Sequence, residues 1–270
     1  MYKVLASDID NTLTASAKEV SPETYAAVRR AVDAGIKVVL ATGRGYKGAL
    51  HICRALDLHG PVINYGGARV NDIDTGDTLL SEAVPPEDIL ELLELARELD
   101  VHAQIYQGDG IVYERESAWA DKYASYLGIN RVIDPDIRKK QWANVPKLLY
   151  IMDPERVKKL EPMLVKRFEG RLEVCLSSPP YIEFTAAGIG KGSALKWLAE
   201  EYWGFKREEV AAIGDNTLDN SMLAYAGLSA AVEDGADATL ALADIITPPC
   251  AGNGVGWLID NVLLKGKGSE

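Results

Sequence analysis

Short apolar runs without polar alternation recur near both ends of this sequence, and amphipathic stretches separate them. Runs of this kind are typical of strands that are buried on both faces, which pair in parallel when helices connect them. A helix start is readable at Ser21-Pro22-Glu23, with serine as the cap and proline in the first turn. The pattern predicts an α/β fold whose core is a doubly wound parallel sheet, with strands at residues 2–7, 36–41, 61–65, 210–214, 228–232 and 244–247.

The alternation of strands and helices breaks at Pro85-Pro86 and resumes near Gly190. Between these points, predicted strands follow one another without an intervening helix, as in HAQIYQ and GIVYE and again in LEVCLS and YIEFT. Neighbouring strands of this kind indicate an antiparallel or mixed sheet. We therefore expect a discontinuous Rossmann-like core, residues 1–83 and 188–270, into which an α+β cap domain, residues 84–187, is inserted.

Charge and cysteine content argue against several classes of partner. The 270 residues carry a net charge of −11 at pH 7 and contain no long basic run, whereas surfaces that bind nucleic acid or anionic membranes cluster lysine and arginine. No apolar run approaches the length of a membrane span. The three cysteines lie far apart and show neither disulfide nor zinc spacing, which suits a reducing compartment. We expect a cytoplasmic protein that binds neither nucleic acid nor membrane.

Acidic residues follow two of the predicted core strands. Asp8 and Asp10 come after the first strand, and Asp215 comes after the strand at 210–214, with Asp219 one helical turn later. Residues two apart on a strand share a face, so Asp8 and Asp10 are expected to point together from its carboxyl end, the edge at which open parallel sheets bind ligands. Taken singly, each acid also fits an ordinary turn or the first turn of a helix.

Groups suited to binding an anion accompany these acids. In the segment LATGRG, Thr42 and the amides of Gly43 and Arg44 lie where the second strand turns into a helix. Lys191 opens the helix KGSALKWLAEEY, a position where a cation opposes the helix dipole and needs another group to favour it. The plainer alternatives are a helix-capping threonine and a solvated lysine.

The joint placement of these residues is more informative than any one of them. Asp8, Thr42 and Asp215 each follow a predicted core strand, and Lys191 begins a core helix. Clustered carboxylates repel by roughly 4 kcal/mol per pair at about 4 Å and an effective dielectric constant of about 20. Mg²⁺ relieves such repulsion and prefers a few carboxylates together with substrate phosphate. The sequence therefore predicts a Mg²⁺ site beside a phosphoryl-binding site.

Four segments, DIDNT, ATGR, KGSAL and GDNTLDNSML, resemble in order and context the four motifs of the haloacid dehalogenase (HAD) superfamily. The resemblance is to the Cof-like sugar phosphatase branch, in which an α/β cap is inserted after the third core strand, and it spans essentially the whole chain. It implies a phosphoric monoester hydrolase that acts with Mg²⁺ on small phosphate monoesters, sugar phosphates or similar metabolites, through an aspartyl-phosphate intermediate.

The resemblance also implies a role for each motif residue. Asp8 would be the nucleophile, and Asp10 would protonate the leaving oxygen and later activate water, because an ionised carboxylate attacks without a base and a partly buried carboxyl can carry a proton. The metal would be bound by Asp8, the backbone carbonyl of Asp10, Asp215 and, as a supporting acid, Asp219. The phosphoryl group would be held by Thr42, Gly43 and Lys191.

Two positions depart from the family pattern. Asn11 stands where glycine is usual, and asparagine is the next best residue for a left-handed backbone. Leu218 stands where the last motif usually has an asparagine that contacts phosphate, and Asn216 and Asn220 are the candidates to replace it. Weaker phosphate binding is therefore one open consequence of the second departure.

Three other functions remain open from the sequence. Residues 43–48, GRGYKG, match the G-x-G-x-x-G pattern of dinucleotide-binding oxidoreductases, although the acid expected after the next strand is replaced by Asn64. A non-enzymatic phosphoacceptor also places acids and Mg²⁺ at strand ends, but it needs no inserted cap. A sugar phosphomutase of the same superfamily would require a sugar bisphosphate and release little inorganic phosphate.

The motifs leave the physiological ester, the breadth of specificity and the oligomeric state open. We expect the cap to close over the substrate and to choose it. Several cap side chains have the size and polarity to take part, but packing within the cap is the simpler expectation, so none is assigned to a site. They are Tyr106, Trp119, Tyr123, Tyr181 and Glu183.

Overall fold

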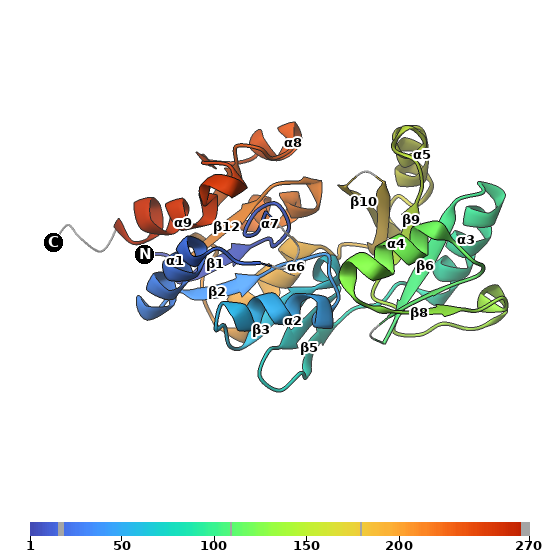
Figure 1. The fold of residues 1–270 in the computed structure, drawn as a ribbon, viewed down its shortest axis with the longest axis horizontal. Coiled ribbons are helices and arrows are strands. Elements are labelled where there is room, and N and C mark those ends of the chain that lie inside the picture. Colours follow the sequence, from blue (N-terminus) through green and yellow to red (C-terminus); the bar gives the residue numbers. More distant parts are fainter. Residues whose placement is uncertain (16–18, 109, 179, 266–270) are drawn as a thin grey trace. The chain divides into compact units, whose positions relative to one another are not determined.

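The computed structural model describes residues 1–15, 19–108, 110–178 and 180–265. It divides into two compact units, each with its own main sheet (Figure 1). Unit 1 comprises Met1–Leu80 and Gly190–Glu270, and unit 2 comprises Ser81–Ile189.

Unit 1 is built on a five-stranded parallel sheet with the order β14-β13-β12-β1-β2. Its strands are β1 (Val4–Ser7), β2 (Lys37–Leu40), β12 (Val210–Gly214), β13 (Leu228–Val232) and β14 (Ile245–Thr247). The strand order reverses at β1, because β2 lies on one side of it and β12 on the other. In open α/β sheets, such a reversal leaves a crevice at the carboxyl ends of the two central strands, where ligands bind.

Helices cover both faces of this sheet, because neighbouring strand residues such as Val4 and Leu5 point into different apolar clusters. One cluster is formed with α1 (Pro22–Asp33), α2 (Tyr46–Ala55) and α9 (Gly254–Leu258). The other is formed with α6 (Lys191–Lys196), the π-helical turn Trp197–Tyr202 and α7 (Asn220–Tyr225). A short α8 (Asp237–Leu240) follows β13. The predicted doubly wound core is confirmed.

Local signals define several of these elements as predicted. The Ser21 hydroxyl caps α1 by accepting a hydrogen bond from the Thr24 amide at 3.1 Å. Asn11 has a φ of 62°, the left-handed backbone that glycine or asparagine tolerates best. Within the described ranges, no helix has the length and apolarity needed to cross a membrane.

The third predicted core strand follows a different path. β3 (Pro61–Asn64) meets the segment after β2 through one isolated parallel bridge, Ala41 to Ile63. It then pairs in antiparallel fashion with β4 (Arg69–Asp72), which leads to β5 (Thr78–Ser81) in a separate three-stranded sheet. The turn after β3 requires glycine at position 67. Gly67 has a φ of +108°, and an added Cβ would lie 2.1 Å from the carbonyl oxygen of Gly190. Glycine therefore lets this turn pack against the segment that precedes Lys191.

Unit 2 contains a six-stranded mixed sheet with the order β10-β11-β9-β6-β7-β8. The strands are β6 (His102–Gln107), β7 (Gly110–Tyr113), β8 (Asn130–Ile133), β9 (Leu148–Ile151), β10 (Leu172–Ser178) and β11 (Tyr181–Ala186). The helices are α3 (Pro86–Glu98), α4 (Ala118–Leu127) and α5 (Pro154–Arg167). The predicted α+β character is confirmed. The edge strand β8 was not predicted, because all four of its residues are exposed and leave no apolar pattern.

Candidate active site

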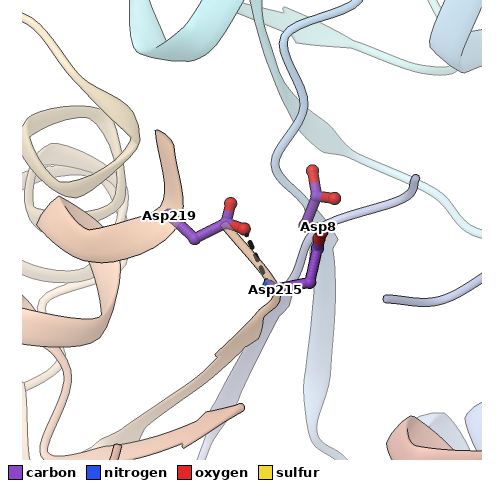
Figure 2. A group of neighbouring side chains, drawn as sticks. All are labelled: Asp8, Asp215 and Asp219. Carbon is purple, nitrogen blue, oxygen red and sulfur yellow. Dashed lines mark hydrogen bonds between the residues drawn. The ribbon is translucent and has the colours of Figure 1, made fainter. Parts of the chain in front are cut away.

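Asp8 and Asp215 lie side by side because their strands are neighbours in register. Ser7 pairs with Ile213 across β1 and β12, and the Asp8 amide donates to the Ile213 carbonyl at 3.1 Å. Carboxylate oxygens of Asp8, Asp215 and Asp219 all lie within 4.8 Å of one another, and the three residues are buried. Figure 2 shows the three side chains gathered at the strand ends. We call these three residues the acid cluster.

Lys191 is fully buried against two members of the acid cluster. Its Nζ donates to Oδ1 of Asp8 and to Oδ1 of Asp219, each at 2.5 Å. These carboxylates are the groups that favour a cation at the start of α6, against the helix dipole. The alternative of a solvated lysine is therefore wrong, since Lys191 is 0% exposed.

Asp219 acts within the cluster as an acceptor for backbone groups. Its Oδ2 accepts from the amides of Asp215 at 3.0 Å, the dashed line in Figure 2, and of Asn216 at 3.1 Å. A Cβ on Gly214 would lie 2.4 Å from the Asp219 Cβ, so glycine permits this approach. Because both oxygens of Asp219 already accept hydrogen bonds, the geometry suits a supporting acid that shapes the loop after β12.

Sequence reasoning missed Thr12. Its hydroxyl donates to Oδ1 of Asp215 at 2.7 Å, and the residue is buried. The sequence signal that could have predicted this contact is Asn11 in the segment DIDNT, because asparagine favours the left-handed backbone seen there. A reversal of the chain at Asn11 brings the side chain of Thr12 back toward the end of the strand. Thr12 thereby fixes the orientation of the Asp215 carboxylate.

Asp10 is paired with Arg44 and is not a member of the acid cluster. β1 ends at Ser7, so the alternation of strand side chains does not extend to Asp8 and Asp10, and the predicted common strand face is wrong. Arg44 donates from Nε to Oδ2 of Asp10 at 2.8 Å and from Nη2 to Oδ1 at 2.5 Å. The Arg44 amide was a predicted anion contact, whereas this pairing of the Arg44 side chain was not predicted.

Thr42 and Gly43 lie at the carboxyl end of β2, beyond Leu40. The Thr42 hydroxyl accepts from the Arg44 amide at 3.1 Å, which makes a local turn. α2 begins after Gly45, which provides no side-chain cap, so the alternative of Thr42 as a helix cap is wrong. The Arg44 amide is used in this turn and the Thr42 amide donates to the Ile63 carbonyl at 2.9 Å, so anion binding by the Thr42 hydroxyl and by Gly43 stays a prediction.

The two asparagines that were candidates to replace the usual residue at Leu218 have different surroundings. Asn216 Oδ1 accepts from the Leu218 amide at 2.9 Å, and its Nδ2 lies 3.4 Å from Oδ2 of Asp215. Asn220 Oδ1 accepts from the Thr239 hydroxyl at 2.8 Å. Asn216 is therefore the one that contacts the acid cluster.

Residues 5–259 match the family model of haloacid dehalogenase-like hydrolases. The chain belongs to this family. The match includes the acid cluster, Lys191 and the Thr42 turn, and it does not agree with the alternative of a dinucleotide-binding oxidoreductase. The predicted superfamily and the predicted enzyme class, a phosphoric monoester hydrolase of HAD type, are confirmed.

Similar proteins span nearly the same length. The chain is 30% identical to the HMP-PP phosphatase of Serratia proteamaculans, over 84% of this chain and 82% of that protein. It is 27% identical to the pyridoxal phosphate phosphatase YbhA of Escherichia coli, over 90% of this chain and 92% of that protein. A crystal structure of a haloacid dehalogenase-like hydrolase from Bacteroides thetaiotaomicron has a TM-score of 0.83 and 29% identity, and covers 97% of this chain and 100% of that one.

Four of the five side chains noted in the insert of this hydrolase make contacts within unit 2. Tyr106 and Tyr123 are buried and share a hydrogen bond between their hydroxyls. Tyr181 packs edge-on against Tyr123, with ring centroids 5.5 Å apart. Glu183 accepts from Lys147 at 2.8 Å, and both residues are buried. These contacts agree with the simpler expectation of packing.

Burial of so many charged groups shifts their ionisation. Burial raises the pKa of Asp8 well above its usual value; Lys191 acts in the opposite direction, and the neighbouring acids add to the rise. Burial, followed by repulsion from Asp219, raises the pKa of Asp215 to about 6. Burial acts to lower the pKa of Lys191, but Asp219 and Asp8 outweigh it and raise that pKa. The lysine therefore stays charged.

The donor set fits a hard divalent cation. Its members are carboxylate oxygens within 4.8 Å of one another, and Lys191 provides one positive charge against three acids. Burial first, and then repulsion from neighbouring acids, raises the pKa values of Asp8 and Asp215, and a bound cation would favour their charged forms. Oxygen-only sites with a few carboxylates are typical of such cations. The acid cluster is therefore the metal-binding candidate of this hydrolase.

The pKa of Asp215 predicts an unusual pH dependence of stability in chelator. Because its folded pKa of about 6 exceeds the usual 3.8, the folded state holds the proton more tightly. Its contribution is therefore fully present below about pH 4 and is lost as the pH rises through 6, by on the order of 3 kcal/mol. We expect the free energy of unfolding of the wild type, minus that of Asp215→Asn, to fall by this amount between pH 4 and 7 in urea titrations. A difference that stays constant with pH would contradict the shift.

Proposed function

We propose that this protein is a Mg²⁺-dependent phosphatase that hydrolyses small phosphate monoesters through an aspartyl-phosphate on Asp8. The observation that carries the proposal is the position of Asp8, buried at the carboxyl end of β1, bound by Lys191 and within 4.8 Å of Asp215. The phosphatases of Serratia proteamaculans and Escherichia coli support the choice of small phosphorylated metabolites as substrates. Sugar phosphates or similar esters are the substrate class we propose.

In the first half of the reaction, Asp8 attacks phosphorus. Lys191 occupies Oδ1 of Asp8, and among the described residues Oδ2 receives no hydrogen bond, so Oδ2 is the attacking atom. A bond forms between this oxygen and phosphorus while the bond to the leaving oxygen breaks, and Asp10 gives that oxygen a proton. Lys191, the Thr42 hydroxyl and Gly43 balance the charge of the phosphoryl oxygens.

In the second half, water hydrolyses the aspartyl-phosphate. Asp10 takes a proton from the water, whose oxygen bonds to phosphorus as the bond to Asp8 breaks, and phosphate leaves. The metal residues we propose are Asp8, the backbone carbonyl of Asp10, Asp215 and, in support, Asp219. Mg²⁺ bound there would neutralise the acids and withdraw charge from the phosphoryl group.

We propose that the insert, residues 84–187 in our sequence assignment, selects the ester. The motif residues all lie in unit 1 and handle the phosphoryl group, so discrimination among leaving groups needs other residues. The three free cysteines support the proposed cytoplasmic location, because oxidising compartments favour disulfides.

The test of the proposed function is a panel of phosphate esters assayed for inorganic phosphate. The panel should include sugar phosphates, pyridoxal phosphate and p-nitrophenyl phosphate, each with Mg²⁺ and with chelator. We expect release with Mg²⁺ to exceed release with chelator by roughly 100-fold or more, and to return when Mg²⁺ is restored, because metal stabilises several kcal/mol of transition-state charge.

Other outcomes of the panel separate the remaining alternatives. A sugar bisphosphate that is isomerised with little phosphate release would indicate the phosphomutase. A stable phosphoprotein without turnover would indicate the phosphoacceptor. Full activity in chelator would contradict the metal requirement.

A further inference from the structure

Arg44 grips the carboxylate of Asp10 with two parallel hydrogen bonds. The Nε–Oδ2 distance is 2.8 Å and the Nη2–Oδ1 distance is 2.5 Å, so both oxygens of Asp10 are engaged by one guanidinium. Paired contacts of this type fix the plane of a carboxylate as well as its position, which a lysine cannot do. The Arg44 side chain is 5% exposed, whereas that of Asp10 is 36% exposed. The arginine is therefore the anchored partner.

Arg44 is held by three further hydrogen bonds, two of its backbone and one of its guanidinium. Its amide donates to the Thr42 hydroxyl at 3.1 Å, and its carbonyl accepts from the Tyr65 amide at 2.9 Å. Its Nη1 donates to the carbonyl of Gly48 in α2 at 3.1 Å. The turns after β2 and β3 thus fix the backbone of Arg44, and the first helical turn of α2 fixes its guanidinium.

The backbone at Asp10 is held by its own turn, because Asp10 bridges to Thr14 and the Asn11 amide donates to the Thr14 carbonyl at 2.9 Å. Asp10 lies beyond the end of β1 and immediately before the left-handed Asn11. An aspartate in such a turn has a short side chain that rotates readily about χ1. Its orientation is therefore set mainly by the arginine, which lies 34 positions along the chain.

We propose that Arg44 is a positioning residue that aims the Asp10 carboxylate at the water that hydrolyses the aspartyl-phosphate. This inference rests on the proposed function. The step needs a carboxylate in a defined orientation, and a two-pronged contact with a guanidinium supplies that orientation. Water bonds to phosphorus, its proton passes to Asp10, and the bond between phosphorus and Asp8 breaks. Arg44 acts through Asp10 and has no bond to the phosphoryl group.

The test uses p-nitrophenyl phosphate, whose leaving group departs without a proton, so formation of the aspartyl-phosphate depends little on Asp10. In Arg44→Gln, we expect kcat to fall roughly 10- to 100-fold while kcat/KM stays within about threefold of the wild type. A burst of p-nitrophenol and a phosphoenzyme that accumulates during turnover should accompany the loss. Arg44→Lys should recover part of kcat, and Arg54→Gln, an exposed arginine later in α2, should change neither constant.

Two comparisons decide the inference. Arg44→Gln in an Asp10→Asn background should cost no more than about twofold in kcat, because the arginine acts through Asp10. A parallel fall of kcat and kcat/KM in Arg44→Gln would show that the arginine contacts the phosphoryl group directly. A rise in kcat would show that Arg44 restrains Asp10. An equal loss in the wild-type and Asp10→Asn backgrounds would show that Arg44 does not act through Asp10. Each of these overturns the inference, as does loss of folding in thermal melts of Arg44→Lys. If the wild type hydrolyses no phosphate ester, the proposed function itself fails.

Discussion

Replacing Asp8 with asparagine is expected to lower phosphate release by roughly 10⁴-fold or more while the protein keeps its fold. An amide oxygen is too weak a nucleophile to attack phosphorus, so no aspartyl-phosphate forms. The fold should persist because asparagine has the same shape and its oxygen still accepts from Lys191. The change also removes one charge from a cluster in which burial and neighbouring acids raise the pKa of Asp8.

The measurement is turnover of the best ester of the panel, together with trapping of the phosphoenzyme and a thermal melt. Asp33→Asn is the matched control, because this aspartate of α1 is 72% exposed and should leave turnover and melting unchanged. Phosphate release at the wild-type rate in Asp8→Asn would remove Asp8 as the nucleophile. A lost fold would show instead that the carboxylate is needed for structure.

Replacing Lys191 is expected to have the second largest effect, on both activity and stability. Its Nζ is fully buried against two carboxylates, and removal of one partner from a buried charged group costs about 3–5 kcal/mol. In the proposed reaction the lysine also balances phosphoryl charge, so we expect Lys191→Met to lower kcat/KM by roughly 10³-fold. Methionine keeps most of the volume, which separates loss of charge from loss of packing.

The stability loss should appear in urea titrations in chelator and shrink in saturating Mg²⁺, because Mg²⁺ bound as we propose would compensate the same acids. Lys196→Ala is the matched control, because this lysine ends the same helix and is exposed. It should change the free energy of unfolding by less than about 0.5 kcal/mol. A change in kcat/KM under about threefold for Lys191→Met would contradict a role in phosphoryl binding.

Much of the fold follows from patterns that lie within single segments. The strands of unit 1 are continuous apolar runs because helices bury both faces of the sheet, and α1 begins where Ser21 provides a cap. The apolar pattern of the sequence does not predict a strand whose residues are exposed, such as β8. It was also incomplete for β3, because antiparallel pairing with β4 draws most of this strand away from the parallel sheet.

The candidate site divides in the same way. Asp8, Thr42 and Asp215 were found from sequence because each directly follows an apolar run, and the carboxyl ends of parallel strands meet at one edge. The contacts of Thr12 with Asp215 and of Arg44 with Asp10 were missed. Each contact joins residues of separate loops, and the distance between them depends on how these loops fold over the sheet. The apolar periodicity of the sequence carries no information on that distance.

The sequence by itself determined the α/β core, the insert and the side chains that gather at the carboxyl edge, because burial makes each core strand an apolar run and each helix an amphipathic stretch. The tertiary structure decided which of those side chains touch. Register between β1 and β12 brings Asp8 to Asp215, and the start of α6 delivers Lys191 to Asp8 from 183 positions away. Charges so distant along the chain influence one another only after folding removes the water between them.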